Sequence, residues 1–235
     1  EVAKIDAELS QKTKKFSENV LDSPNAWELI EHADSRLGGL PAMAIEGARL
    51  DALQNGHGSE DAPKWRFTLQ YPSMGPVMQY ADDESIRKDV WAANCTVGRD
   101  GKFNNSQLVW DILDLRQQKA TALGVATFPD MILQRRMAKT GRAALNFTED
   151  LHGKIHERFV GETKSLQDYK AEQTGEASAA LEPWEGSYWA EKRRKEQYDF
   201  DDEALRPYFP VNQVMDGMFE ITSKIFGIKI AEREA

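Results

Sequence analysis

Apolar residues recur at intervals of three and four along most of this sequence, and that spacing restricts its fold more than any other feature. Residues three and four apart share one face of an α-helix, so each such series predicts an amphipathic helix. One series predicts a long helix over 141–173. The most regular series precedes Gly227, a natural helix end, and consists of Val214, Met218, Ile221 and Ile225. Together with the absence of βαβ alternation, these series predict a mainly α fold.

Few segments depart from the helical spacing. Residues 54–63 have the composition of a loop, and residues 65–69 alternate apolar and polar side chains as a strand does. The serine and proline at 23–24 have the pattern of a helix cap followed by Pro, which predicts a short helix through 27–30. We therefore expect a multi-helix assembly, a single helical region over 1–235, with at most a small strand element near residues 65–70.

Charge and cysteine content exclude several classes of protein. The formal net charge is −9 and the sequence pI is about 5.1, which argues against a nucleic-acid partner. Apolar runs are only a few residues long, far below the roughly 20 that a membrane-spanning helix needs. Cys95 is the single cysteine, so an internal disulfide is impossible and a reducing compartment is favoured. We expect a cytoplasmic protein with no membrane partner.

His152 and His156 raise the possibility of a metal site. They are four residues apart in a predicted helix, the spacing that zinc peptidases use. The zinc peptidase motif also needs a glutamate directly after the first histidine as general base, and Gly153 stands there. Glu157 or Glu162 could supply a third ligand, but nothing in the sequence selects either. We favour the alternative of two polar residues on a solvated helix face, and we assign no metal-ligating residue.

Other candidates for chemistry have simpler structural explanations. Cys95 has no histidine or acid near it in sequence, which favours a buried or incidental thiol over a nucleophile. The basic run 192–195 follows Trp184 and Tyr188, but their spacing is that of a buried stripe and glutamates flank the run, so a packed helix with a charged outer face is favoured. The acidic pairs at 82–83 and 201–202 precede predicted helices and are expected to cap them. We assign no catalytic or cofactor-binding residue.

Several short runs, in order along the chain, resemble the thimet oligopeptidase and oligopeptidase A family of zinc endopeptidases. The matching runs extend from about residue 5 to residue 230, and the segment 201–210, Asp-Asp-Glu-Ala-Leu-Arg-Pro-Tyr-Phe-Pro, is the most specific. The others are 16–22, 39–41, 67–73, 76–81, 104–105, 112–116, 123–124, 183–184 with Tyr188 and Lys192, 214–219 and 225–228. The sequence departs from the family pattern at 74–75, 94–97 and 133–136, which bears on subfamily and peptide preference.

The resemblance implies a large, mostly helical, two-lobed peptidase with a channel between its lobes. In that family the His-Glu-x-x-His zinc helix, its downstream glutamate ligand and the substrate-binding tyrosines lie after the region matched here, and no position of 1–235 corresponds to them. The resemblance also implies that the helix carrying His152 and His156 is not the metal helix. Zinc is therefore expected only in a catalytic domain outside this chain.

Two functions are compatible with these residues. The first is a helical scaffold and substrate-channel segment of an oligopeptide-cleaving zinc metalloendopeptidase, inactive by itself, a fragment that precedes the catalytic domain. Its partners would be the catalytic lobe of the same polypeptide and, for the whole enzyme, short peptides cut by metal-assisted attack of water. The alternative is a free-standing, non-catalytic helical interaction protein derived from that family.

Overall fold

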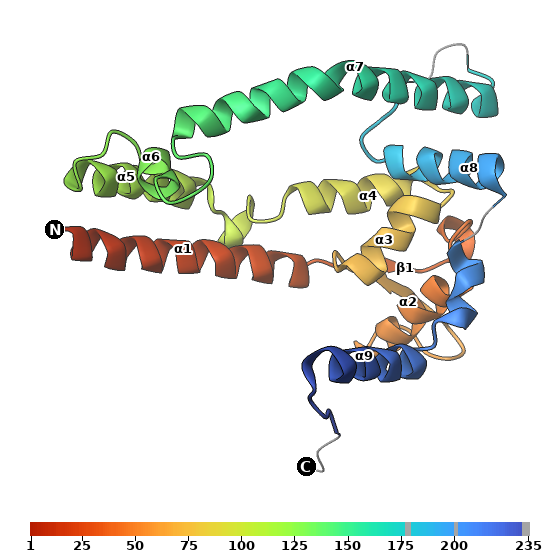
Figure 1. Ribbon diagram of the computed structural model, residues 1–235. Coiled ribbons are helices and arrows are strands. Elements are labelled where there is room, and N and C mark those ends of the chain that lie inside the picture. Colours follow the sequence, from red (N-terminus) through yellow and green to blue (C-terminus); the bar gives the residue numbers. More distant parts are fainter. Residues whose placement is uncertain (177–179, 200–201, 232–235) are drawn as a thin grey trace. The chain divides into compact units, whose positions relative to one another are not determined.

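The computed structural model describes residues 1–176, 180–199 and 202–231, and they are mainly α-helical, as predicted (Figure 1). The chain divides into two compact units, Glu1–Glu191 and Lys192–Ala235, which are described separately here. The prediction of a single helical region stays a prediction. No helix among the described residues is long and apolar enough to cross a membrane.

The first unit contains most of the secondary structure. Its elements in chain order are α1 (Val2–Asn25), β1 (Leu29–Glu31), the 3-10 turn η1 (Asp34–Arg36), α2 (Ala42–Gln54), β2 (Trp65–Phe67), α3 (Tyr71–Tyr80), α4 (Glu84–Cys95), the 3-10 turn η2 (Gly101–Phe103), α5 (Ser106–Ala122), α6 (Phe128–Leu133), α7 (Gly141–Thr174) and the start of α8 (Gly186–Tyr198). The second unit contains the rest of α8, the 3-10 helix η3 (Asp202–Tyr208) and α9 (Val211–Phe226).

The core of the first unit lies where α2, α3 and α4 meet a two-stranded sheet. Strands β1 and β2 pair antiparallel, with Leu29 opposite Phe67. Phe67 is 2% exposed, and Val77, Ile86 and Val90 are fully buried around it. Burial of each such side chain stabilises the fold by about 1.5–3 kcal/mol, so this cluster holds the sheet and the three helices together.

The strand β1 contradicts the helix predicted to begin at Ser23-Pro24. Instead α1 continues to Asn25, Pro24 lies in its last turn, and residues 29–31 form a strand. Pro24 has no N–H to donate, and one residue before the end of α1 this loss and the crowding by its ring affect only the last turn of the helix. The apolar residues 27–30 are drawn into sheet pairing by β2, a partner more than thirty residues away that local spacing does not reveal.

Most helix ends follow the predicted signals. The Asp83 carboxylate accepts from the Ile86 N–H at the start of α4, and Gly227, with φ of 66°, ends α9. The cap predicted at Asp201-Asp202 lies outside the residues whose side chains the structure describes. The short helix α6 was not predicted, although Thr127 caps it and Pro129 stands in its first turn.

Candidate functional site

The histidine pair lies on an exposed face of α7. The rings of His152 and His156 are 5.0 Å apart between centroids, and both side chains are exposed. Within 1–176, 180–199 and 202–231, no three histidine, cysteine or acidic side chains group closely enough to hold a metal ion. A catalytic zinc site needs three protein ligands, and the two imidazoles have no third ligand beside them among the described residues. Gly153 also stands directly after His152, where the motif needs a glutamate, so the pair does not fit a catalytic zinc site. The prediction that this chain carries no zinc stays a prediction.

Cys95 is the last residue of α4, and its side chain is exposed. The expectation of a buried thiol is therefore wrong, because α4 turns its core face inward at Ile86 and Val90 and Cys95 lies off that face. The other expectation, a thiol with no specific role, stays a prediction.

The most elaborate polar cluster joins α3, α4 and α8. Asp82, in the turn between α3 and α4, accepts a hydrogen bond of 2.9 Å from the Tyr188 hydroxyl on α8. Arg87 is 2% exposed, donates to the Ala81 and Asp82 carbonyls at 2.6 and 3.1 Å, and stacks 4.1 Å from the Tyr188 ring centroid. Arg87 thereby satisfies carbonyls at the end of α3, which the helix itself leaves open. We call this cluster of Asp82, Arg87 and Tyr188 the α3–α8 junction.

Gly39 completes the α3–α8 junction from the loop before α2. It has φ of 81°, and a Cβ built there would lie 2.3 Å from the Tyr80 carbonyl oxygen. The neighbouring Gly38 carbonyl accepts from the Asp82 N–H at 2.8 Å. Only glycine allows the loop to approach the turn this closely.

The aromatic residues beside the basic run are partly used in packing. Trp184 packs on Trp91 with centroids 5.4 Å apart and donates to Glu84 at 2.9 Å. Tyr188 is buried as predicted, but Trp184 is half-buried and precedes α8, which begins at Gly186. Within the described residues, none of the four cations at 192–195 is without an interaction, in agreement with a packed, charged helix.

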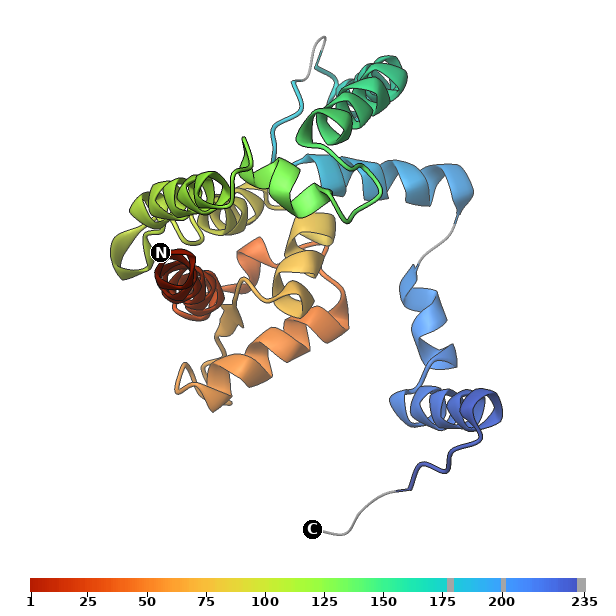
Figure 2. The same cartoon turned by 60° about the vertical axis from the view of Figure 1, so that its left-hand side comes forward.

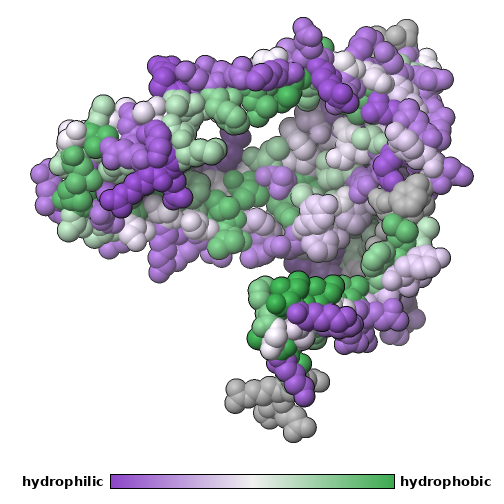
Figure 3. All heavy atoms as spheres, viewed as in Figure 1, coloured by the Kyte–Doolittle hydropathy of each residue, from purple (hydrophilic) through white to green (hydrophobic). Residues whose placement is uncertain are grey.

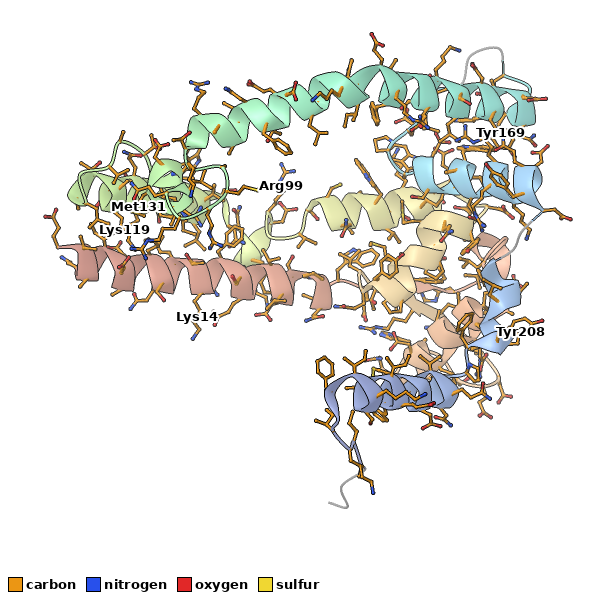
Figure 4. All side chains as sticks on the ribbon, in the orientation of Figure 1. Lys14, Arg99, Lys119, Met131, Tyr169 and Tyr208 are labelled. Atoms are coloured by element: carbon orange, nitrogen blue, oxygen red, sulfur yellow. The ribbon has the colours of Figure 1, made fainter. Side chains whose placement is uncertain are left out.

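A buried ion pair attaches the end of α7 to the start of α8. Lys170 donates to Glu185 at 2.8 Å, and the Glu182 N–H donates to the same carboxylate at 2.8 Å. Burial raises the pKa of Glu185, but these hydrogen bonds outweigh burial and hold the pKa below its ordinary value. Beside the pair, Tyr169 on α7 points toward α8 and meets the Trp189 ring edge-on at 6.3 Å (Figure 4).

A second buried joint connects α1 and α5, which lie side by side (Figures 1 and 2). The Asn19 amide donates to the Asn105 side-chain oxygen at 2.8 Å, and the Asn105 amide donates to the Phe16 carbonyl at 3.1 Å. Both asparagines are almost fully buried. The side-chain oxygen of Asn19 has no partner among the described residues. We call this pair the asparagine joint.

A cleft of about 440 Å³ opens between the end of α1, α2 and the segment after β2. Its floor is apolar, formed partly by Phe67 and Ala48. On its rim Arg66 is tied to Glu28 and Asp51, each at 2.6 Å. The cleft could admit a small apolar group, but its charges are already paired.

Residues 77–235 match peptidase family M3. The chain belongs to this family. It is 34% identical to oligopeptidase A of Haemophilus influenzae and 31% identical to oligopeptidase A of Escherichia coli, in each case over 98% of this chain and 34% of the relative. It is 33% identical to the organellar oligopeptidase A of Arabidopsis thaliana, over 98% of this chain and 29% of the relative. The chain therefore spans about a third of the length of these M3 relatives.

Several residues of the asparagine joint and the α3–α8 junction lie in the runs that resemble the family. Gly39, Asn19, Asn105 and Tyr188 all fall in the runs that resemble the family. Gly39 and Asn105 meet backbone carbonyls, whereas Asn19 and Tyr188 donate to the side chains of Asn105 and Asp82. Arg87 was not anticipated from the sequence. The signal for it was a cation beside Ile86 and Val90, on the core face of a predicted helix.

Proposed function

We propose that this chain is the helical scaffold and substrate-channel segment of an oligopeptide-cleaving zinc metalloendopeptidase of family M3, not catalytic by itself. Membership of the family and coverage of about a third of its relatives support a part of such an enzyme. The polar clusters support the scaffold role, because Asp82, Arg87, Asn105 and Glu185 each make a hydrogen bond that links two neighbouring elements. The chemistry would belong to residues outside this chain, since His152 and His156 do not fit the zinc.

The exposed apolar face of α7 is the observation that carries the proposal. Leu151, Ile155 and Phe159, spaced by four, are 45%, 52% and 64% exposed, whereas Leu166 further along the helix is 8% exposed. Figure 3 shows hydrophobic atoms (green) along one edge of α7 and hydrophilic atoms (purple) along the other. Exposed apolar strips of this kind mark interaction surfaces. We assign the catalytic lobe of the same polypeptide as the partner that covers it.

The second unit supports the same conclusion by itself. Along α9 the predicted series is exposed, with Val214 at 49%, Met218 at 48%, Ile221 at 59% and Ile225 at 67%. Because the described residues leave this stripe exposed, we expect the isolated chain to self-associate. Sedimentation measurements that find only monomers would contradict this expectation.

A segment exchange tests the scaffold role. The aligned third of the Haemophilus influenzae oligopeptidase A is replaced by this chain, and hydrolysis of a quenched fluorescent peptide is measured. We expect the chimera to be active and the variant Ile155→Asp, Phe159→Asp to lose activity and thermal stability. The control Lys154→Asp, Lys164→Asp changes exposed ion-paired residues on the charged side and is expected to stay active. An active Ile155→Asp, Phe159→Asp chimera would refute the packing role.

Catalytic inactivity has its own test. The purified chain with added zinc is expected to cleave no peptide. Turnover that persists through purification and disappears in the His152→Ala, His156→Ala variant would show that the pair is a real site. Turnover unchanged in that variant would indicate a contaminating peptidase.

The coding sequence that follows this segment distinguishes the scaffold role from the alternative, a free-standing interaction protein. A reading frame that continues to a His-Glu-x-x-His motif supports the scaffold, and a stop codon after position 235 supports the alternative. We further propose a cytoplasmic location with short peptides as the substrates of the whole enzyme and neither nucleic acid nor membrane as a partner. The net charge of −9 and the single cysteine support these assignments.

A further inference from the structure

The turn between α6 and α7, whose backbone can be followed in Figure 2, is basic, whereas the whole chain is acidic. Residues 131–148 contain four cations, Arg135, Arg136, Lys139 and Arg142, and no carboxylate, whereas the whole chain carries −9. All four side chains are exposed. Within the described part of the chain, none of the four makes an ion pair or a side-chain hydrogen bond. The turn therefore presents a concentrated positive charge that no carboxylate in these residues offsets.

The carboxylate nearest in sequence is committed elsewhere. Asp130 accepts from the Gly141 N–H at 2.8 Å and from the Thr127 hydroxyl at 2.7 Å. Its two oxygens thus attach the start of α7 to the cap of α6. They fix the ends of the turn and do not pair with its cations.

The turn contains backbone hydrogen bonds of its own. The Arg136 N–H donates to the Leu133 carbonyl at 2.8 Å, and the Thr140 N–H donates to the Ala138 carbonyl at 2.8 Å. Lys139 has φ of 65°, a left-handed conformation that is uncommon for a residue with a side chain. A turn ordered in this way presents its cations without a large further loss of conformational entropy on binding.

A methionine stands in the middle of these cations. Met137 is 97% exposed, and Ile132 at the end of α6 is 45% exposed. Methionine is a flexible, polarizable side chain that is common at surfaces which bind varied peptides. The surface thus combines positive charge with an apolar centre.

We propose that the basic turn, defined as Arg135, Arg136, Met137, Lys139 and Arg142, docks a separate acidic peptide segment in which carboxylates flank an apolar side chain. Charge complementarity selects the acidic partner, and Met137 receives the apolar side chain. The docking surface goes beyond the scaffold role and does not depend on it. Docking is tested by peptide binding to the chain itself and the scaffold role by activity of the chimera, so either proposal can be refuted while the other stands.

Fluorescence anisotropy with a labelled peptide tests the docking surface. The probe contains four glutamates around one leucine, and a second probe replaces the glutamates by glutamines. We expect binding of the first probe only, weakened as salt rises because exposed charges are screened. The variant Arg135→Gln, Arg136→Gln, Arg142→Gln is expected to bind about tenfold more weakly. Its circular dichroism spectrum should be unchanged, since these exposed side chains make no ion pair or side-chain hydrogen bond within the described residues.

A matched control keeps the same change in net charge. Lys4→Gln, Lys15→Gln, Arg99→Gln removes three exposed cations outside the turn and is expected to bind normally. Met137→Gln is expected to weaken the leucine-containing probe. Equal weakening in the control variant would overturn the proposal, because net charge would then explain the binding. Competition by tripolyphosphate as strong as that by the peptide, with no effect of Met137→Gln, would also overturn it in favour of a general polyanion surface.

Discussion

The asparagine joint predicts an unequal cost of removing its two members. Asn105→Ala removes the acceptor of the Asn19 amide and the donor to the Phe16 carbonyl, at positions where water is excluded. A buried polar group left without its partner costs about 1–3 kcal/mol, so we expect Asn105→Ala to lower the free energy of unfolding by about 2–4 kcal/mol. That is a large fraction of the roughly 5–15 kcal/mol of a typical domain.

Asn19→Ala is expected to cost less, about 1–2 kcal/mol. It also deletes one hydrogen bond, but it removes with it the Asn19 oxygen that has no partner among the described residues. The double variant should cost less than the sum of the single ones, because the bond between the two side chains is lost only once.

Urea unfolding followed by tryptophan fluorescence measures these costs, since all six tryptophans lie within Glu1–Glu191. Asn55→Ala is the control, because Asn55 is exposed and its side chain bonds, among the described residues, only to Asp51. It should change the free energy of unfolding by less than about 0.5 kcal/mol. The reasoning is refuted if Asn105→Ala matches that control or if Asn19→Ala is the more destabilising variant.

Three further predictions concern single positions. Gly39→Ala should destabilise by about 2 kcal/mol or more in the same urea assay because of its positive φ and the blocked Cβ position, whereas Gly47→Ala, in open space within α2, should stabilise by about 0.5–1 kcal/mol. Tyr188→Phe should cost about 1.5–3 kcal/mol by removing the hydrogen bond to a carboxylate. The pKa of Glu185 is lowered in the folded state, so its ionised carboxylate contributes to the free energy of unfolding above a pH of about 4.3, and this contribution is lost as the pH falls further. In melting experiments at a series of pH values, Glu185→Gln should therefore lose less stability between neutral and acid pH than the unchanged chain does.

Long helices were predictable because their spacing is repeated many times. The predicted helix over 141–173 is observed as Gly141–Thr174, and the series from Val214 to Ile225 lies in α9. The elements missed are short or depend on distant partners. The strand β1 has three residues and exists through its pairing with β2, and α6 has six residues, too few to show a period.

The polar clusters were predictable only in part. Asn19 and Asn105 lie 86 positions apart, and an asparagine in a helix is ordinarily solvated, so neither residue indicates the other. The position of Arg87, a cation beside core residues of a predicted helix, was a local signal, but the sequence did not indicate which groups would accept its hydrogen bonds. The family resemblance marked Gly39 and Tyr188 without saying that both meet Asp82.

The apolar series along α7 shows why exposure cannot be read from periodicity. The same face continues from Leu151 through Phe159 to Leu166, yet only the last of these is buried. Close to Leu166 in sequence, the end of α7 contacts the segment that enters α8, through the Lys170–Glu185 pair and the Tyr169–Trp189 contact. The apolar spacing of α7 is that of a helix covered along its whole length, but among the described residues only the part near Leu166 is buried. Phe159 is 64% exposed to solvent, and this exposed apolar face supports the proposal that the catalytic lobe covers this part of α7.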